Sequence, residues 1–103
     1  VVASLTKFMG GHGTTLGGVI VDGGRFDWAS HQKRFPQFST PDVSYHGMVY
    51  TDRYGAGAYL ARARSVYQRT TGAVMPAMSA FLLLQGIETV ALRVERHVEN
   101  ARK

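Results

Sequence analysis

Apolar runs near the two ends of the first 24 positions predict two β-strands with a glycine-rich connection between them. The first run is Val1 to Ala3, and the second is the β-branched run Val19 to Val21, which Asp22-Gly23-Gly24 ends. Glycines at positions 10, 11, 13, 17 and 18 permit positive φ angles and close backbone approach. We therefore expect a strand–loop–strand unit over residues 1–24.

The second half of the chain has the periodicity of helices. Strong helix formers run from Ala58 to about Arg69, and Gly72 is placed as a C-terminal stop. Pro76 can open a second helix with the run Phe81 to Leu84, which is apolar all round and is therefore expected to be buried. Apolar residues with charges opposite them then recur at helical spacing, at Ile87, Val90, Ala91, Val94, Val98 and Ala101. This last helix has an apolar face that needs a partner.

Residues 25–57 mix aromatic, proline and polar residues without a clear period. This composition is typical of a long irregular connection, with room for one helical turn near Asp27. Short strands followed by helices predict an α/β chain in three parts, 1–24, 25–57 and 58–103. Because the chain opens in strand-like sequence without Met and closes in a helical pattern, we expect a single fragment of a longer protein.

Composition narrows the functional classes. The 103 residues are the size of one domain, and 12 Lys and Arg against 7 Asp and Glu give a net charge of +5. Cysteine is absent, which excludes disulfides and thiolate metal sites and favours a cytoplasmic location. The longest apolar run, Ala80 to Leu84, is too short to cross a bilayer, and no signal-peptide pattern opens the chain.

Metal and nucleotide sites are disfavoured by spacing. The four histidines are too scattered for a helical metal site, at His12, His31, His46 and His97, and no metal is expected. The glycine-rich run lacks the Gly-Lys-Ser or Gly-Lys-Thr of nucleotide hydrolases, so nucleotide binding is disfavoured as well.

A nucleic-acid interface is the other alternative that the charge raises. Arg62 and Arg69 are seven residues apart, with Arg64 nearby, so a basic stripe on one helix is conceivable. A solvated helix face is the simpler interpretation. Trp28 and the tyrosines are not interleaved with basic residues, which favours core or loop packing over base stacking.

With those sites disfavoured, the remaining candidates for a functional site are Ser4, Thr6 and Lys7. Two hydroxyls two residues apart can converge on one anion while the adjacent lysine supplies an amine. The glycines just beyond let backbone N–H groups and a ligand approach closely. A phosphate-bearing aldehyde cofactor requires this combination. The alternative is an ordinary loop lysine in a small, basic, non-catalytic binding module.

The stretch SLTKFMGGHGTTLGGVIVDGG, residues 4–24, resembles the cofactor-lysine segment of the pyridoxal-phosphate-dependent Cys/Met metabolism enzymes. In that family Ser-x-Thr-Lys is followed by an aromatic residue, glycines and a histidine. Within it, SYHGMVY at 44–50 and AFLLLQGIETVALRVERHVENA at 80–101 resemble most closely the O-acetylhomoserine sulfhydrylases. QRTTGAVMPAMS at 68–79 departs from the family, which more often has a polar residue before the proline.

The resemblance implies an α/β fragment from the large domain of a fold-type-I pyridoxal-phosphate transferase. In that frame residues 58–103 lead toward a C-terminal domain that is missing from this chain. Lys7 corresponds to the lysine that binds the cofactor covalently, and Ser4 and Thr6 correspond to hydroxyls that bind its phosphate. His12 falls in the family's Gly-His-Gly loop and is assigned no catalytic step.

The implied reaction is γ-replacement on O-acetylhomoserine with sulfide or a thiol, which gives homocysteine or methionine. A cystathionine synthase or γ-lyase is the alternative within the family. The implied partners are a small amino-acid substrate and further copies in a homo-tetramer, with no nucleic acid and no membrane. The isolated chain is expected to be inactive, because the family's nitrogen-binding aspartate, stacking ring and carboxylate-binding arginine are not matched in it.

Overall fold

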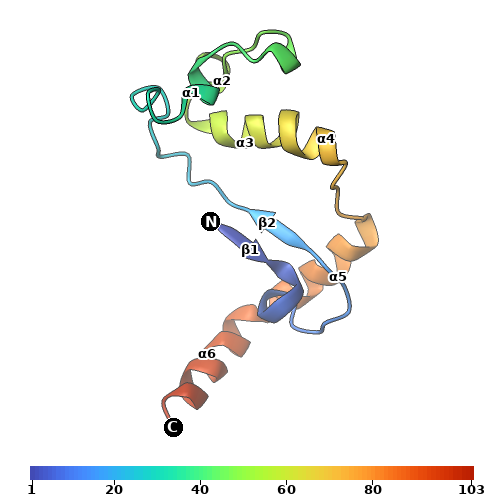
Figure 1. Cartoon of the computed structure of the whole chain (residues 1–103). Coiled ribbons are helices and arrows are strands. Elements are labelled where there is room, and N and C mark those ends of the chain that lie inside the picture. The colour runs from blue at the N-terminus through green and yellow to red at the C-terminus, as the bar shows by residue number, and fades with distance from the viewer. The chain divides into compact units, whose positions relative to one another are not determined.

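A computed structural model describes all residues of the chain, 1–103, as two short strands and a series of helices (Figure 1). The chain divides into two compact units. The first unit joins the two ends of the sequence, Val1–Val21 and Met75–Lys103, and the second is the continuous segment Asp22–Val74. The chain is thus a small, helix-rich α/β chain with one two-stranded sheet.

The sheet of the first unit confirms the two predicted strands with a shift of one residue. Strand β1, Val2–Ser4, pairs antiparallel with β2, Gly18–Ile20, and Ala3 lies opposite Val19. One turn of π-type helix, η1, Leu5–Met9, follows β1 directly. Ser4 is therefore the last residue of a strand, and Lys7 lies in a helical turn between the strands.

Two helices complete the first unit and meet at a sharp bend (Figure 1). Helix α5 spans Ala77–Glu88 and α6 spans Val90–Ala101, and the two are bent by 55° at Thr89. The prediction that Ile87 begins the last helix was wrong, because Ile87 belongs to α5. Only this bent pair, taken together, has the length and composition of a membrane span, and no single helix has them.

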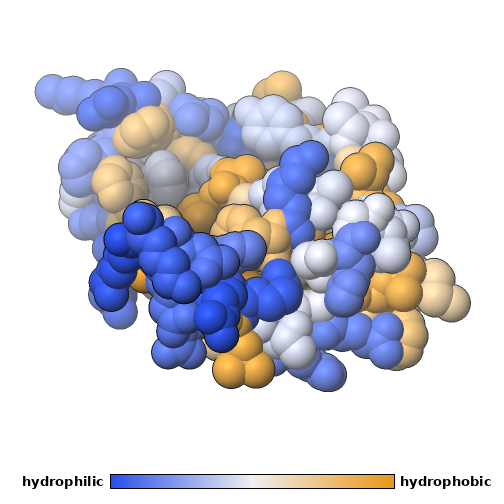
Figure 2. All heavy atoms as spheres, turned by 90° about the horizontal axis from the view of Figure 1, so that it is seen from below, coloured by the Kyte–Doolittle hydropathy of each residue, from blue (hydrophilic) through white to orange (hydrophobic).

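Helix α5 is not buried all round, which corrects the prediction from its apolar sequence. Leu83 is 3% exposed, whereas Phe81 is 54% and Leu84 is 62% exposed. Figure 2 shows hydrophobic residues at the surface on one face of the molecule, interspersed with hydrophilic ones. The physical reason is that α5 is covered on one side, by the surface that η1 and the glycine loop form. Leu83 packs there against Gly10 and Gly17.

The second unit is helical in short pieces. The predicted irregular connection contains short helices, and the helical turn expected near Asp27 is instead α1, which begins at Pro36. The predicted helix from Ala58 is confirmed as one continuous run to Thr71, and Gly72 ends it in the left-handed conformation. In chain order the pieces are α1 Pro36–Ser39, η2 Val43–Tyr45, α2 Tyr50–Tyr54, η3 Gly55–Gly57, α3 Ala58–Arg62, η4 Ala63–Gln68 and α4 Arg69–Thr71.

Aromatic side chains form the core of the second unit. Phe38, Tyr50 and Ala58 are buried together, and Trp28 packs against this group. The Trp28 ring stacks on Tyr59 with centroids 5.7 Å apart and planes at 10°. The prediction that Trp28 serves packing is confirmed, because an offset aromatic pair with a buried neighbour contributes to the core.

Candidate functional site

Lys7 lies in a helical turn that its own backbone interrupts. Its φ of −88° and ψ of −129° lie outside the helical region, in the middle of η1. The N–H of Gly10 donates to the Leu5 carbonyl and the N–H of Gly11 donates to the Lys7 carbonyl, both at 2.8 Å. These two hydrogen bonds close the turn, so the backbone sets the position of Lys7.

The glycines that follow serve the two purposes predicted for them. Gly11 and Gly13 have φ of +80° and +63°, in the left-handed region that L side chains rarely adopt. Gly17 is needed for space, since a Cβ there would lie 2.5 Å from a methyl carbon of Leu83. The prediction for these glycines is confirmed. Their backbone conformations let the loop return from Lys7 to strand β2, which begins at Gly18.

The hydroxyl groups of Ser4 and Thr6, predicted as phosphate donors, differ in their hydrogen bonds. Thr6 Oγ1 accepts a hydrogen bond from the N–H of Gly17 at 3.0 Å and donates a longer one, 3.3 Å, to the carbonyl of the same residue. Ser4 precedes η1 and makes no capping hydrogen bond with its side chain, and it is exposed. The Thr6 hydroxyl therefore ties the start of the turn to the end of the glycine loop, while the Ser4 hydroxyl stays available.

An open pocket of about 660 Å³ adjoins the lysine. We call it the lysine pocket, and its lining comes from η1, the glycine loop and α6: Thr6, Lys7, Phe8, Gly11, Gly13, Leu92, Arg93, Arg96 and His97. The two ion pairs of the structure join Arg62 to Asp42 and Arg96 to Glu99, so the amine of Lys7 has no carboxylate partner. The structure thus brings Thr6 and Lys7 to one pocket, and Ser4 does not line it.

Arg93 is a residue of this region that the sequence interpretation missed. Its guanidinium group donates hydrogen bonds to the carbonyls of Phe8, Met9 and Gly86. The charges of the last helix were predicted to lie opposite its apolar face, and Arg93 is an exception. Its position three residues after Val90 places it beside that face, and this spacing is the one sequence signal that could have indicated it.

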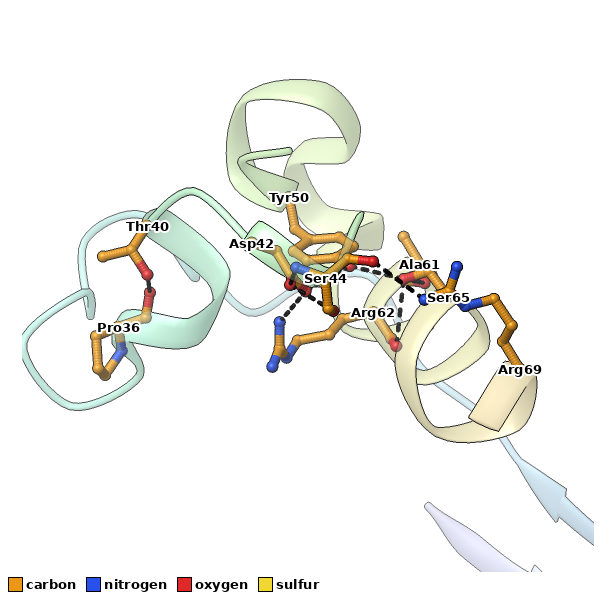
Figure 3. A network of polar contacts seen from close by, with 9 residues as sticks. All are labelled: Pro36, Thr40, Asp42, Ser44, Tyr50, Ala61, Arg62, Ser65 and Arg69. Carbon is orange, nitrogen blue, oxygen red and sulfur yellow. Dashed lines mark hydrogen bonds and ion pairs between the residues drawn. The ribbon is translucent and has the colours of Figure 1, made fainter. Parts of the chain in front are cut away.

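A second polar cluster lies within the second unit and centres on Asp42 (Figure 3). Its carboxylate accepts hydrogen bonds from the N–H and hydroxyl of Ser44, from the Tyr50 hydroxyl at 3.0 Å and from Arg62 at 2.8 Å. Tyr50 also shares a hydrogen bond of 2.7 Å with the Ser65 hydroxyl. The hydrogen bond from Ser44 is the largest cause that lowers the pKa of Asp42, with smaller contributions from Tyr50 and Arg62.

The arginines of the second unit do not form the basic stripe considered from the sequence. Arg62 is paired with Asp42, and 17% of its side chain is exposed. Arg69 donates to the Ser44 carbonyl at 3.1 Å and lies over the Tyr45 ring, 5.3 Å from its centroid. The alternative of a solvated helix face is confirmed for Arg64 and Arg69, which are exposed, and is wrong for Arg62, which is mostly shielded from solvent.

The histidines and acidic residues do not form a cluster that could bind a metal ion. No group of three His, Cys, Asp or Glu side chains comes close enough together to hold a metal ion. His12 is exposed in the glycine loop, His31 Nδ1 donates to the Asp27 carbonyl, and His46 takes a left-handed φ of 58° in an exposed turn. The candidate chemistry of the chain thus stays with the region of Lys7.

Comparison with known proteins gives a match over the whole chain. A family described as "Cys/Met metabolism PLP-dependent enzyme" matches residues 1–103. The chain is 52% identical over 103 residues to a homocysteine/cysteine synthase of Saccharomyces cerevisiae and 54% identical over 101 residues to a homocysteine synthase of Schizosaccharomyces pombe. It is 50% identical over 106 aligned positions to an O-acetyl-L-homoserine sulfhydrylase of Corynebacterium glutamicum.

These matches cover nearly all of the chain but a small part of each relative. The alignments include 100%, 98% and 100% of this chain and 23%, 24% and 24% of the three relatives, in the order given. The chain therefore spans about a quarter of the length of the curated relatives that it matches.

We predict that Asp42 makes the second unit sensitive to acid. Because its folded pKa is lowered, its contribution to stability is present above its unfolded pKa of about 3.9 and is lost as the pH falls through the folded value. Asp42→Asn should reduce the free energy of unfolding by about 1–3 kcal/mol at pH 7 and flatten its decline as the pH falls below about 4. Urea unfolding followed by tryptophan fluorescence measures both effects, since Trp28 is the sole tryptophan.

The exposed Asp52 in the first turn of α2 supplies the matched control, and Asp52→Asn should cost under about 1 kcal/mol at pH 7. An acid dependence in Asp42→Asn as steep as that of the unchanged chain would contradict the role of Asp42.

Proposed function

Because the chain belongs to the family of Cys/Met metabolism PLP-dependent enzymes, where PLP is pyridoxal phosphate, we propose that it supplies the cofactor-lysine segment of a longer enzyme. We call this longer protein, of the relatives' length, the whole enzyme. The proposal includes a fold-type-I architecture, with this chain in the large α/β domain. A cytoplasmic location and a homo-tetramer belong to the same proposal.

The side chains near Lys7 fit a cofactor with an aldehyde and a phosphate. Lys7 lines the lysine pocket, its amine has no carboxylate partner, and the Ser4 hydroxyl is available as a donor. Thr6 has one hydroxyl proton, which now goes to a carbonyl at 3.3 Å. That proton can turn to a phosphate while the oxygen keeps the 3.0 Å hydrogen bond from Gly17. These observations support Lys7 as the covalent attachment and Ser4 and Thr6 as phosphate donors.

The proposed reaction replaces acetate on O-acetylhomoserine by sulfide and gives homocysteine, and a thiol in place of sulfide gives methionine. The observation that carries this proposal is the 50–54% identity to a homocysteine synthase and an O-acetyl-L-homoserine sulfhydrylase over the whole chain. When bound, pyridoxal phosphate withdraws electrons from the substrate Cα. Lys7 binds the cofactor through Nζ and, once the substrate amine takes its place, moves protons at the substrate.

Two alternatives to this reaction are a non-catalytic binding module and a different enzyme of the same family. Membership of an enzyme family disfavours a non-catalytic basic module. A cystathionine synthase or γ-lyase would share the lysine segment and differ in the sulfur compound that it uses. Product analysis of the whole enzyme with O-acetylhomoserine and either sulfide or cysteine separates them, because the sulfhydrylase forms homocysteine from sulfide and a synthase forms cystathionine from cysteine.

We predict that Lys7→Ala in the whole enzyme abolishes the visible absorbance of the bound cofactor and homocysteine formation. Lys7 is the lysine that lines the pocket, and alanine offers no amine to the aldehyde. The spectrum of the purified protein after incubation with excess pyridoxal phosphate and removal of the free cofactor measures this. Lys33→Ala, at an exposed position, is the matched control and should keep the wild-type band. A wild-type band in Lys7→Ala would exclude Lys7 as the attachment point.

The phosphate assignment predicts a loss of cofactor affinity without loss of the attachment lysine. Ser4→Ala should weaken binding of pyridoxal phosphate about tenfold or more, since a hydrogen bond to a charged group contributes about 1.5–3 kcal/mol. Thr6→Val should do the same and also lower the melting temperature of the apoenzyme, because it removes the acceptor of the Gly17 N–H. Equilibrium dialysis and thermal unfolding give the two values.

Thr6→Ser keeps the hydroxyl and should recover most of both losses, whereas Thr14→Val, at an exposed position of the same loop, should change neither. Unchanged cofactor affinity in the double variant Ser4→Ala with Thr6→Val would place the phosphate elsewhere.

The isolated chain should not catalyse the reaction. Pyridoxal-phosphate chemistry needs a carboxylate that keeps the ring nitrogen protonated and groups that align the substrate with the ring. The family's residues for these tasks are not matched in this chain, which spans 23–24% of the relatives. We therefore expect homocysteine formation from O-acetylhomoserine and sulfide at the rate of free pyridoxal phosphate. A rate comparable to that of an intact family enzyme would contradict the proposal that a longer protein is needed.

A further inference from the structure

We propose that Arg93 is a positioning residue for Lys7, and this inference rests on the proposed function of Lys7. Arg93 lies in the first turn of α6, more than 80 residues from the turn that it contacts. It touches neither the Lys7 amine nor the two proposed phosphate donors. It acts through the backbone that follows the lysine.

The guanidinium group of Arg93 joins three carbonyls and one hydroxyl. One Nη donates to Phe8 O, and the other donates to Met9 O at 2.9 Å and to Gly86 O at 2.6 Å. Nε donates to the Thr89 hydroxyl at 3.2 Å. Four of its N–H groups are thus in use, and hydrogen bonds from a charged donor are stronger than neutral ones.

The two carbonyls after Lys7 depend on this arginine. The non-helical angles of Lys7 interrupt the helical turn, and no backbone N–H donates to Phe8 O or Met9 O. Carbonyls without a donor are costly when they are shielded from water, which applies to the part-buried contact at Met9 O more than to the exposed one at Phe8 O. Arg93 supplies both donors from one rigid planar group, so it fixes the peptide units directly after Lys7 relative to the end of α5.

Close packing makes this arrangement specific. A Cβ on Gly86 would lie 1.8 Å from the Gly10 carbonyl oxygen, and a Cβ on Gly11 would lie 2.6 Å from the guanidinium carbon of Arg93. The glycine loop therefore lies directly on the junction of α5 and α6, with no room for a shifted register. A flexible lysine in place of Arg93 could reach one carbonyl at a time, since an ammonium group lacks the planar fork.

A direct role of Arg93 in binding an anion is the competing assignment. Arg93 does line the lysine pocket. However, both Nη atoms already donate to carbonyls, and turning them to a phosphate or a substrate carboxylate would leave Phe8 O and Met9 O without donors. The contacts therefore favour positioning over ligand binding.

The test uses the whole enzyme with Arg93→Ala, Arg93→Lys and the control Arg102→Ala, at an exposed residue after the end of α6. The primary readout is the pH midpoint of the visible band of bound pyridoxal phosphate, which reports the surroundings of the Lys7 amine. The second readout is the yield of cofactor fixed on Lys7 by borohydride, determined by peptide mass mapping.

Arg93→Ala should shift the pH midpoint, lower the fixed yield at limiting cofactor and reduce kcat/KM about tenfold or more, chiefly through kcat. Millimolar guanidinium ion should restore part of the lost rate in Arg93→Ala, because it can fill the vacated site. Arg93→Lys should fall between Arg93→Ala and the unchanged enzyme, and Arg102→Ala should match the unchanged enzyme in every readout.

An unchanged pH midpoint and kcat in Arg93→Ala, with only a lower melting temperature, would overturn the inference in favour of a merely structural role. If Arg93→Ala does not fold, Arg93→Lys decides, and a wild-type midpoint there also overturns it. Failure of the proposed function looks different, because the unchanged enzyme itself would then show no cofactor fixed on Lys7.

Discussion

The arrangement around Lys7 depends on one close backbone contact, that between Gly10 and Gly86. The two residues approach so closely that a single methyl group on Gly86 would overlap the Gly10 carbonyl. This contact places the turn η1 on the end of α5, where the Arg93 guanidinium can reach the carbonyls of Phe8 and Met9. The bend at Thr89 follows from the same geometry, because the Gly86 carbonyl accepts from Arg93 and from the Thr89 hydroxyl.

The two units are stabilised in different ways. The second unit has a buried aromatic core with an internal polar network around Asp42, and its contacts close on themselves. In the first unit, Leu83 is the one large side chain that is fully buried. Phe81, Leu84 and apolar residues of α6 such as Leu92 are exposed in this unit, which is consistent with the proposed longer protein.

Local signals predicted the local features of the fold. Glycine chemistry indicated the loop after Lys7 and the end of the helix at Gly72, and β-branched residues indicated strand β2. Features set by contacts between distant residues could not be predicted. The role of Arg93 depends on partners up to 85 residues away, and the exposure of Phe81 depends on what the unit offers to cover it. Ser4, Thr6 and Lys7 could be named from the sequence, but the Thr6 hydrogen bonds to Gly17 required the structure.

Three of the four aspartates of the chain are held by hydrogen bonds within their own turns, and one carboxylate oxygen of Asp22 has no hydrogen-bond partner. Asp22, Asp27 and Asp42 each accept a hydrogen bond from a backbone N–H two or three residues later, at 2.9–3.2 Å. Such short-range hydrogen bonds stabilise turns and helix starts. Hydrogen bonds from Ser30 and Ser44 also lower the pKa of Asp27 and Asp42, so these carboxylates are stabilised as anions where they are. Releasing one of them to pair with a cofactor nitrogen would cost its local turn.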